Sequence, residues 1–414
     1  MLSNTLTMEK TKVAIIGTVG LPAKYGGFET LTAHLVEELS DTYEFTVYCS
    51  SKKYSPEERV DTWKGAKLKY LPLDANGIQS IPYDTWSIFH ALFRSDVLLI
   101  LGVAGAWLLP FVRLFTNKKI IISIDGIEWK RDKWSLPAKL YLWWAEKLAV
   151  KFSHIDISDN ESIQDYTSLR YKTISRVIEY GADHTKVNLT PTPENIEKYP
   201  FLSDEYAVKV CRIEPENHVH TILNVFSELP DRKLVLVGNW KNSEYGINLK
   251  QQYAGFKNIH LLDPIYEQQT IDLIRGNASL YIHGHSAGGT NPSLVEAMFL
   301  GLPIISNGVS YNRTTTEHQA FYFSNAIELK NILAEVKNEE IENCAFQMKK
   351  IAERRYTWKK IAKKYSNLIE ESFTIKKKTH VYPIISKLDK NILEKYNVGH
   401  LKNVQLFNES PKTT

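Results

Sequence analysis

The stretch HGHSAGGTNPSLVEAM, residues 283–298, decides the fold. An apolar run ends at its first histidine, small residues form a loop, and a helix is predicted to begin at Pro292. Asn291 is a favoured residue type just before a helix, and proline is favoured in its first position. The backbone N–H groups at such a helix N-terminus attract anions. The stretch therefore predicts a strand, a loop and a helix, one repeating unit of a parallel α/β sheet.

The same pattern of strand, turn and helix recurs on both sides of this stretch. Most expected strands are near-continuously apolar, as strands covered on both faces are. They are expected at 12–19, 45–50, 66–73, 96–102, 119–125, 154–158, 176–180, 206–211, 233–238, 258–262, 278–283, 303–306 and 320–323. Helical periodicity between them is clearest at Phe28–Leu39. The fold class is therefore predicted to be α/β, with doubly wound parallel sheets.

The length and the linker composition predict two domains. The 414 residues exceed the ~250–300 at which a single core stops growing. A polar, proline-containing segment then interrupts the pattern. We expect a first domain at 1–187, a linker at 188–204, a second domain at 205–355, a helix at 356–375 and a tail of unknown role at 376–414. Two Rossmann-like domains place a ligand-binding cleft between the carboxyl ends of their sheets.

The composition limits the cellular compartments and the kinds of binding partner that can be expected. A net charge of +4 gives no reason to expect nucleic acid binding. Three distant cysteines without a CxxC pair exclude a disulfide framework and favour a reducing, cytoplasmic compartment. Residues 1–12 lack the apolar core of a secretory signal. The apolar stretch Val97–Val112 is shorter than the ~18–20 residues that span a bilayer, so we expect a buried strand and an apolar helix there.

Two further segments have residues suited to anions. Residues 17–29 read GTVGLPAKYGGFE, a glycine-rich turn that feeds a helix, which indicates either an anion site or a plain tight turn. It does not match the GxGxxG dinucleotide pattern. Arg212 follows the expected strand 206–211 and offers a two-pronged donor for phosphate oxygens. Its alternative is a surface ion pair with Glu214 or Glu216.

The helix after Pro292 has its own candidate residues. Glu296, one turn in, can accept two hydrogen bonds from a vicinal diol, as acidic residues do at the ribose in nucleotide-binding folds. His283 and His285 alternate at the strand end, but no third ligand stands at a sensible spacing. No metal site is expected.

Taken together, these segments resemble retaining glycosyltransferases of the large family 4, which have the GT-B fold, and within it the bacterial rhamnosyltransferases of capsule and cell-surface polysaccharide synthesis. The resemblance covers roughly residues 11–372. It rests on GTVGLPAKYGGFE at 17–29, DGIEWKR at 125–131, RIEPEN at 212–217 and GGTNPSLVEA at 288–297.

The resemblance implies roles for individual residues. Arg212 would bind the donor diphosphate and Glu296 the ribose hydroxyls. Gly26 and Gly27 would border the cleft from the first domain. The loop along the pyrophosphate and the transferred sugar would be Gly288, Gly289, Thr290 and Asn291.

Two positions depart from the family pattern. The family usually has a second diphosphate-binding residue, a lysine, where this chain has Asn217. It usually has a sugar-binding glutamate where this chain has Gly288. Fewer polar partners suit a deoxysugar, so the expected donor is dTDP-rhamnose, with another hexose as the alternative.

The expected chemistry is transfer of the sugar without a metal or other cofactor. Arg212 and the helix N-terminus at Asn291 would stabilise the charge that builds on the departing diphosphate. Asp125 and Glu128 follow a first-domain strand, and either would orient or deprotonate the acceptor hydroxyl. The alternative is that Asp125 only forms a turn and Glu128 is an exposed charge.

A membrane contact is expected from the aromatic and basic segment Trp129–Lys147, unless its tryptophans pack in the core. The resemblance implies a lipid-linked saccharide acceptor, met at the inner face of the cytoplasmic membrane. Two other function classes stay open. One is a nucleotide-sugar epimerase of the same fold, and the other is a non-catalytic nucleotide-sugar-binding protein.

Overall fold

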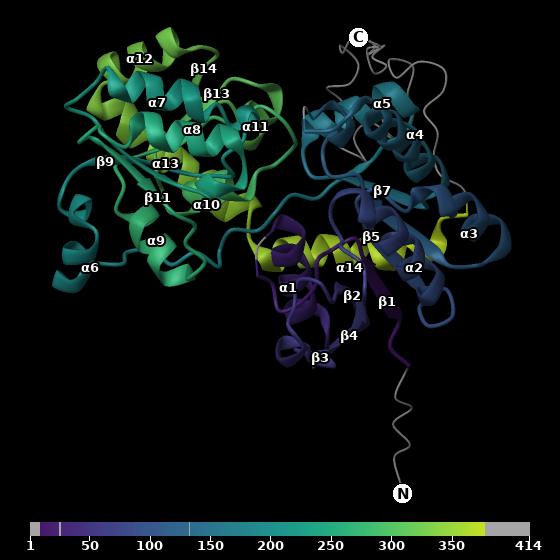
Figure 1. Cartoon of the computed structure of the whole chain (residues 1–414). Coiled ribbons are helices and arrows are strands. Elements are labelled where there is room, and N and C mark those ends of the chain that lie inside the picture. The colour runs from purple at the N-terminus through teal and green to yellow at the C-terminus, as the bar shows by residue number, and fades with distance from the viewer. Residues whose placement is uncertain (1–8, 25, 132, 377–414) are drawn as a thin grey trace, which may run out of the picture. The chain divides into compact units, whose positions relative to one another are not determined.

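The computed structural model describes residues 9–24, 26–131 and 133–376. These residues form two compact units (Figure 1). The first unit takes in the described parts of residues 1–159, 163–178 and 362–414, and the second takes in 160–162 and 179–361. Apart from Lys376, the tail without an expected role lies outside the described residues.

The first unit is built on an eight-stranded sheet in the order β3-β4-β2-β1-β5-β6-β7-β8. All neighbouring strands are parallel except β3 and β4, which form an antiparallel edge. The strands are β1 (Lys12–Ile16), β2 (Glu44–Ser50), β3 (Thr62–Trp63), β4 (Ala66–Leu71), β5 (Val97–Leu101), β6 (Lys119–Ser123), β7 (Ile155–Ser158) and β8 (Arg176–Val177). The central strand β5 is buried at every position, as its unbroken apolar run predicts.

Six helices accompany this sheet. They are α1 (Gly27–Leu39), α2 (Ser80–Ala91), α3 (Leu109–Phe115), α4 (Leu136–Phe152), α5 (Glu161–Tyr171) and α14 (Trp358–Thr374). Residues of α2, α3 and α4 pack with alternate residues of β1, β5 and β6 in one apolar cluster. Most of α14 also belongs to this unit, where the Tyr43 hydroxyl lies 3.0 Å from the Ser366 hydroxyl.

The second unit has a six-stranded, fully parallel sheet in the order β11-β10-β9-β12-β13-β14. Its strands are β9 (Tyr206–Val210), β10 (Lys233–Val237), β11 (Ile259–Leu262), β12 (Leu280–His283), β13 (Ile304–Asn307) and β14 (Phe321–Phe323). Its helices are α6 (Pro193–Lys198), α7 (Val219–Ser227), α8 (Glu244–Tyr253), α9 (Gln268–Gly276), α10 (Pro292–Phe299), α11 (Ser310–Thr315), α12 (Ala326–Glu335) and α13 (Asn338–Arg355).

The predicted fold class is confirmed: two sheets, one parallel apart from its β3–β4 edge and one fully parallel, each with its own helices, make the chain an α/β protein with two Rossmann-like units. The apolar stretch 97–112 divides into β5, a short turn and the start of α3, as expected. No helix within the described residues has the length and apolar character needed to cross a membrane. The proline-containing segment 188–204 includes the helix α6. The sequence does not predict this helix, because prolines among polar residues are interpreted as a sign of a linker.

Candidate active site

The glycine-rich turn after β1 is shaped by close backbone approaches. Gly17 has a φ of +92°, and a Cβ at this position would lie 1.9 Å from the carbonyl oxygen of Leu101. Only glycine fits there. The turn carries the chain from β1 toward α1, whose first residue is Gly27.

The side chain of Glu29, in the first helical turn of α1, accepts hydrogen bonds from groups of the glycine-rich turn. Its carboxylate accepts hydrogen bonds from the backbone N–H of Val19 at 2.6 Å and from the Thr18 hydroxyl at 3.0 Å. Burial raises the pKa of Glu29. A Cβ on Gly26 would lie 1.8 Å from the Glu29 carboxylate, so Gly26 makes room for that side chain. Of the two interpretations of this segment, the geometry favours an internally satisfied tight turn over an anion site.

Asp125 and Glu128, the two carboxylates that were candidates for orienting the acceptor hydroxyl, have different surroundings. Asp125 and Gly126 both have left-handed backbones, with φ of +53° and +59°, which is the geometry of a tight turn after β6. Glu128 is not an exposed charge. Its carboxylate receives Arg131 at 3.1 Å, Lys133 at 2.8 Å and the Trp134 indole at 2.9 Å.

The neighbouring Arg131 and Lys133 determine whether Glu128 is ionised. Burial alone would raise its pKa, but the charges of Arg131 and Lys133 lower it. A carboxylate held ionised by two cations is a weak base, so Glu128 is better suited to positioning than to proton abstraction. The basic residues that were expected to meet a membrane are in part committed to Glu128.

The tryptophans of the segment 129–147 differ in how far they are buried. Trp129 is buried, and its indole N–H donates to the Tyr166 hydroxyl at 2.9 Å. The Arg170 guanidinium lies over the Trp129 and Trp143 rings. Trp144 is exposed. For Trp129 the core-packing alternative is therefore correct.

In the second unit, Arg212 stands after β9 with a half-exposed side chain. Its nearest carboxylate is Glu214, at 3.7 Å. Asn217 fixes the loop that carries it, because its amide donates to the Arg212 carbonyl at 2.9 Å and its oxygen lies 2.9 Å from His285 Nδ1. Asn217 is buried. Where the family usually has a lysine, this chain thus has the buried amide of Asn217, which forms hydrogen bonds within the protein and carries no charge.

The loop from β12 to α10 packs closely on the Arg212 loop. A Cβ on Gly284 would lie 2.3 Å from the Asn217 carbonyl, and the Ser286 N–H donates to the Glu216 carbonyl at 2.9 Å. Gly288 has a φ of +115°, which favours glycine. Asn291 caps α10 by accepting from the Ser293 N–H at 3.0 Å, as predicted.

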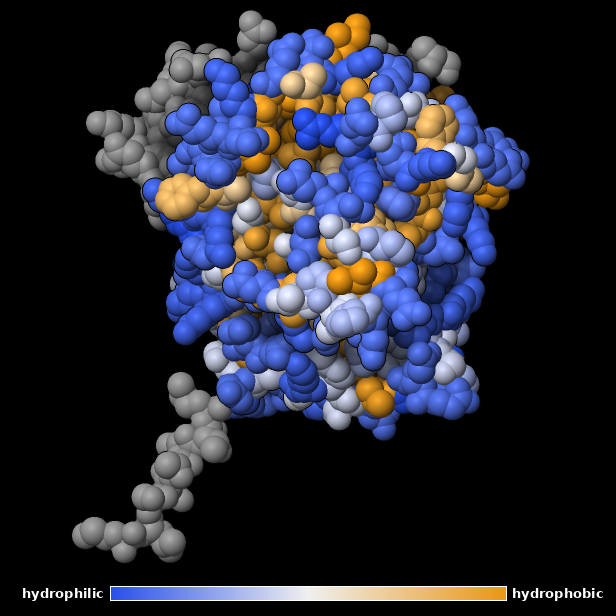
Figure 2. All heavy atoms as spheres, turned by 90° about the vertical axis from the view of Figure 1, so that its left-hand side faces the viewer, coloured by the Kyte–Doolittle hydropathy of each residue, from blue (hydrophilic) through white to orange (hydrophobic). Residues whose placement is uncertain are grey.

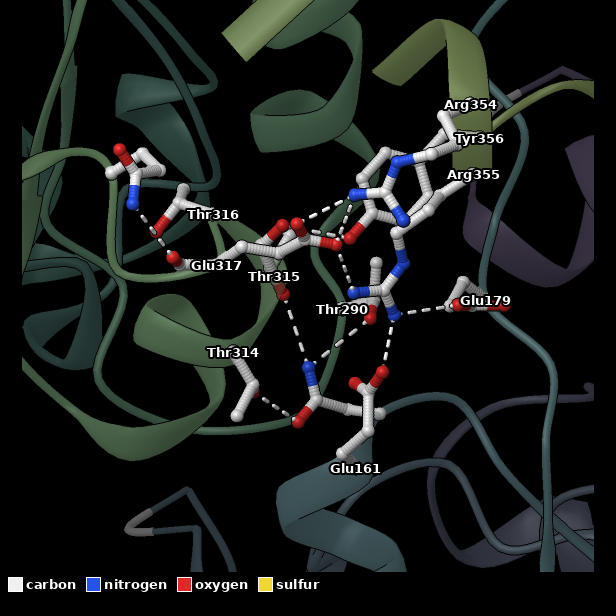
Figure 3. A network of polar contacts seen from close by, with 12 residues as sticks. Glu161, Glu179, Thr290, Thr314, Thr315, Thr316, Glu317, Arg354, Arg355 and Tyr356 are labelled. Carbon is white, nitrogen blue, oxygen red and sulfur yellow. Dashed lines mark hydrogen bonds and ion pairs between the residues drawn. The ribbon is translucent and has the colours of Figure 1, made fainter. Parts of the chain in front are cut away.

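Thr290, in the same loop, is buried and held by a polar network (Figure 3). Its hydroxyl accepts from the Asn160 amide at 3.3 Å, and the same amide donates to the Thr315 hydroxyl at 3.0 Å. Beside it, the Arg355 guanidinium pairs with Glu179 at 2.7 Å, Glu317 at 3.0 Å and Glu161. Thr290 is thus held in place within the loop 288–291 by this network.

Glu296, the expected ribose residue, lies in a chain of buried polar groups. One carboxylate oxygen pairs with Arg275, and the other lies 3.1 Å from His184 Nε2. The Trp358 indole donates to His184 Nδ1 at 3.0 Å, which leaves the ring proton on Nε2, pointing to Glu296. Burial would raise the pKa of Glu296, but Arg275 and His184 lower it to about 2. Glu296 is thus held ionised as an acceptor.

The histidines of the β12 end do not form a metal site. Among the described residues no group of three or more His, Cys, Asp or Glu side chains is placed to hold a metal ion. His285 pairs with Asn217, and His283 is buried with Nε2 lacking a hydrogen-bond partner.

The predicted site residues therefore fall in two groups. Gly26, Gly27, Asp125 and Glu128 belong to the first unit, whereas Arg212, Asn217, the loop 288–291 and Glu296 belong to the second. Sequence reasoning missed Asn160, His184, Arg275 and Trp358, which lie outside the recognised segments. It also missed Glu29, although this residue ends the segment 17–29.

Comparison with known proteins identifies the two halves separately. Residues 192–364 match the family described as "Glycosyl transferases group 1", and residues 10–183 match a domain of unknown function (DUF1972). No match was found among curated protein sequences.

Solved structures show the same fold. Sucrose-phosphate synthase from Thermosynechococcus elongatus is 16% identical with a TM-score of 0.72, covering 88% of this chain and 100% of that one. HepE of Anabaena, solved with UDP-glucose, is 16% identical with a TM-score of 0.67, covering 87% and 99%. The catalytic domain of starch synthase IV from Arabidopsis thaliana, bound to ADP and acarbose, is 13% identical with a TM-score of 0.64, covering 89% and 100%. The chain thus has the GT-B fold, and its residues 192–364 match the model of the glycosyl transferases group 1 family.

Proposed function

We propose that this protein transfers a sugar from a nucleoside diphosphate donor, which binds at the carboxyl edge of the second sheet. The observation that carries the proposal is the grouping of Arg212, the loop 288–291 and the ionised Glu296 on the segments that follow β9 and β12. Ligands of open α/β sheets bind at this edge. HepE, solved with UDP-glucose, and starch synthase IV, bound to ADP, share this fold, which supports a nucleotide as the ligand.

The roles follow from the chemistry of the leaving group. Arg212 offers a guanidinium that no carboxylate engages closely, and the α10 N-terminus adds backbone donors. Both stabilise negative charge on the departing diphosphate, so transfer needs no metal. Glu296 accepts from the ribose hydroxyls. Asp125 orients the acceptor hydroxyl, and the reaction retains the configuration of the sugar.

For the donor we propose dTDP-rhamnose. Gly288 stands where the family has a carboxylate that contacts the sugar, and a 6-deoxysugar requires fewer polar partners. Incubation of the purified protein with dTDP-rhamnose, UDP-glucose and UDP-galactose, each with a lipid-diphosphate-linked monosaccharide, tests this. Rhamnosyl product is expected with the first donor. Product from another donor alone contradicts rhamnose, conversion of a donor without acceptor indicates an epimerase, and binding without turnover indicates a non-catalytic protein.

For the acceptor we propose a lipid-linked saccharide, reached at an anionic membrane surface. The support is an apolar face of the first unit over α2, α3 and α4. Its exposed side chains, between 39% and 75% accessible, are Trp86, Phe89, Phe93, Phe111, Leu114, Phe115, Leu136, Leu140 and Trp144. Trp86 and Phe89 are three residues apart on α2, Phe111 precedes Leu114 and Phe115 by three and four residues on α3, and Leu136, Leu140 and Trp144 follow at four-residue intervals on α4. Residues at these spacings share one side of a helix.

These three helices lie side by side. The Trp107 indole, just before α3, donates to Thr85 of α2 at 2.9 Å, and α3 packs on α4. Ordinary surface is different: the face drawn in Figure 2 is mainly hydrophilic, with hydrophobic residues scattered in small groups. A concentration of exposed aromatic residues marks an interaction site.

Charge favours a membrane as the partner. The acidic residues of the three helices, Asp84 and Glu146, are both buried, whereas Lys147 and Lys151 are exposed. A face with aromatic residues and exposed lysines, and without exposed carboxylates, suits anionic lipid.

Sedimentation with vesicles tests this surface. The protein is expected to bind phosphatidylglycerol vesicles more tightly than phosphatidylcholine vesicles. The triple change Phe111→Ser, Leu114→Ser and Phe115→Ser is expected to release it, whereas Ile327→Ser with Phe346→Ser, equally exposed in the second unit, is not. Equal vesicle binding by both variants contradicts the membrane role. Dimers that only the first variant disrupts would assign the face to a second copy instead.

A further inference from the structure

A lysine lies buried inside the second sheet. Lys209 is the fourth residue of β9, in register with Leu236 of β10, and its exposed fraction is 1%. Lysine is almost never fully buried unless it is paired. Among the residues that the structure describes, no hydrogen bond or ion pair joins Lys209 to another group. Within the described ranges, therefore, no group balances its charge.

The groups around Lys209 add no negative charge. They are Cys211, two residues further on the strand, His218, which precedes α7, and His283 at the end of β12. Burial raises the pKa of the Cys211 thiol, so it is neutral near pH 7. The pKa of His218 and of His283 is lowered by burial and further by the charge of Lys209.

His283 gives a second, independent sign of a missing partner. Its Nε2 is buried without a hydrogen-bond partner. β12 pairs with β9 through Tyr281 and Val208, so His283 and Lys209 both lie near the carboxyl edge of the sheet. This is the edge from which Arg212 and the loop 288–291 begin.

We propose that Lys209 is a second cation for the donor diphosphate and replaces the family lysine whose position Asn217 occupies. Lys209 precedes Arg212 by three residues, about 10 Å along an extended strand, a separation that two long basic side chains can share around one diphosphate. The inference rests on the proposed function, because it assigns a further residue to the same donor site.

Burial favours the uncharged amine when no anion is present. A bound diphosphate acts in the opposite direction, because a nearby anion favours the ammonium. The lysine then stabilises the diphosphate anion as the bond to the sugar breaks.

The test is binding of UDP and dTDP to Lys209→Met, measured by calorimetry in two buffers of different ionisation enthalpy. We expect binding at least tenfold weaker than in the wild type, and any proton uptake that the wild type shows on binding should be absent from the variant. Uridine and thymidine, which lack phosphate, should bind the two proteins equally. Lys233→Met, which removes a partly exposed lysine at the amino end of β10, is the matched control.

Stability separates this role from a structural one. Lys209→Met replaces a buried amine that has no hydrogen-bond partner among the described residues with an apolar side chain, so the ligand-free variant should be at least as stable as the wild type in urea. If Lys209→Met does not fold, Lys209→Gln gives the same comparison, and failure of both to fold makes the lysine structural and overturns the inference. A wild type that binds neither nucleotide contradicts the proposed function itself. A wild type that binds them while Lys209→Met binds equally well contradicts this inference alone.

Discussion

Replacement of Glu296 by glutamine tests the residue that is proposed to accept hydrogen bonds from the ribose hydroxyls. Glu296→Gln keeps the size of the side chain and removes its charge. In the folded protein this charge pairs with Arg275, whose side chain is only 3% exposed, and with His184 at 3.1 Å. The variant therefore loses an ion pair as well as a proposed ribose ligand.

The magnitude follows from the pKa. The pKa of Glu296 falls from 4.5 to about 2 in the folded protein. A difference of about 2.5 units corresponds to about 3 kcal/mol of free energy of unfolding. Because the folded pKa is depressed, this stabilisation is complete above pH 4.5 and is lost as the pH falls toward 2. At pH 3 less than half of it should remain.

Urea unfolding of both proteins between pH 7 and pH 3 measures this difference. Glu296→Gln is expected to be less stable by up to about 3 kcal/mol at pH 7, and the two proteins should converge as the pH falls. Glu353→Gln, at an exposed position of α13, is the control and should show no such effect. Equal stability at pH 7, or a difference that stays constant down to pH 3, would refute the pairing on which this reasoning depends.

Three further changes have expected outcomes. Arg212→Ala should weaken nucleotide binding or turnover at least tenfold, since a charge-assisted hydrogen bond contributes ~1.5–3 kcal/mol; unchanged kinetics in a folded variant would remove Arg212 from the site. Trp358→Phe deletes the indole donor that fixes the His184 tautomer, so it should cost about 1 kcal/mol of unfolding free energy and weaken binding of UDP more than binding of pyrophosphate; equal losses for both ligands would show that the ribose is not involved. Activity should persist in EDTA, and abolition with rescue by one divalent ion would contradict the metal-free mechanism.

The fold followed from features that act locally. Continuous apolar runs such as β5 predict strands that are covered on both faces, and Asn291 with Pro292 predicts the start of α10 because capping depends on the adjacent residues alone. The segments that were missed lack these signals. β3 has two residues, too few for a pattern, and α6 begins at a proline that was taken as a sign of linker.

The site was less predictable because its residues depend on partners far apart in the sequence. Arg212 and Glu296 were found through their segments, but no pattern places Arg275 or His184 beside Glu296. The sequence likewise could not show that Glu29 fills the glycine-rich turn, because that follows from backbone geometry. Whether a tryptophan is buried is also a tertiary property, as Trp129 and Trp144 demonstrate.

The course of α14 has a consequence for synthesis. The helix begins in the second unit, and its residues 362–374 complete the first, where Arg176 pairs with Glu371 at 2.8 Å. N-terminal domains usually fold first as a chain emerges from the ribosome, at ~5–20 residues per second. Here the N-terminal unit must wait until the second unit has been translated, roughly 10–40 s at that rate. Without α14, this unit is exposed to chaperones and proteases during that interval, and a stop codon before α14 would damage the half of the protein that was made first.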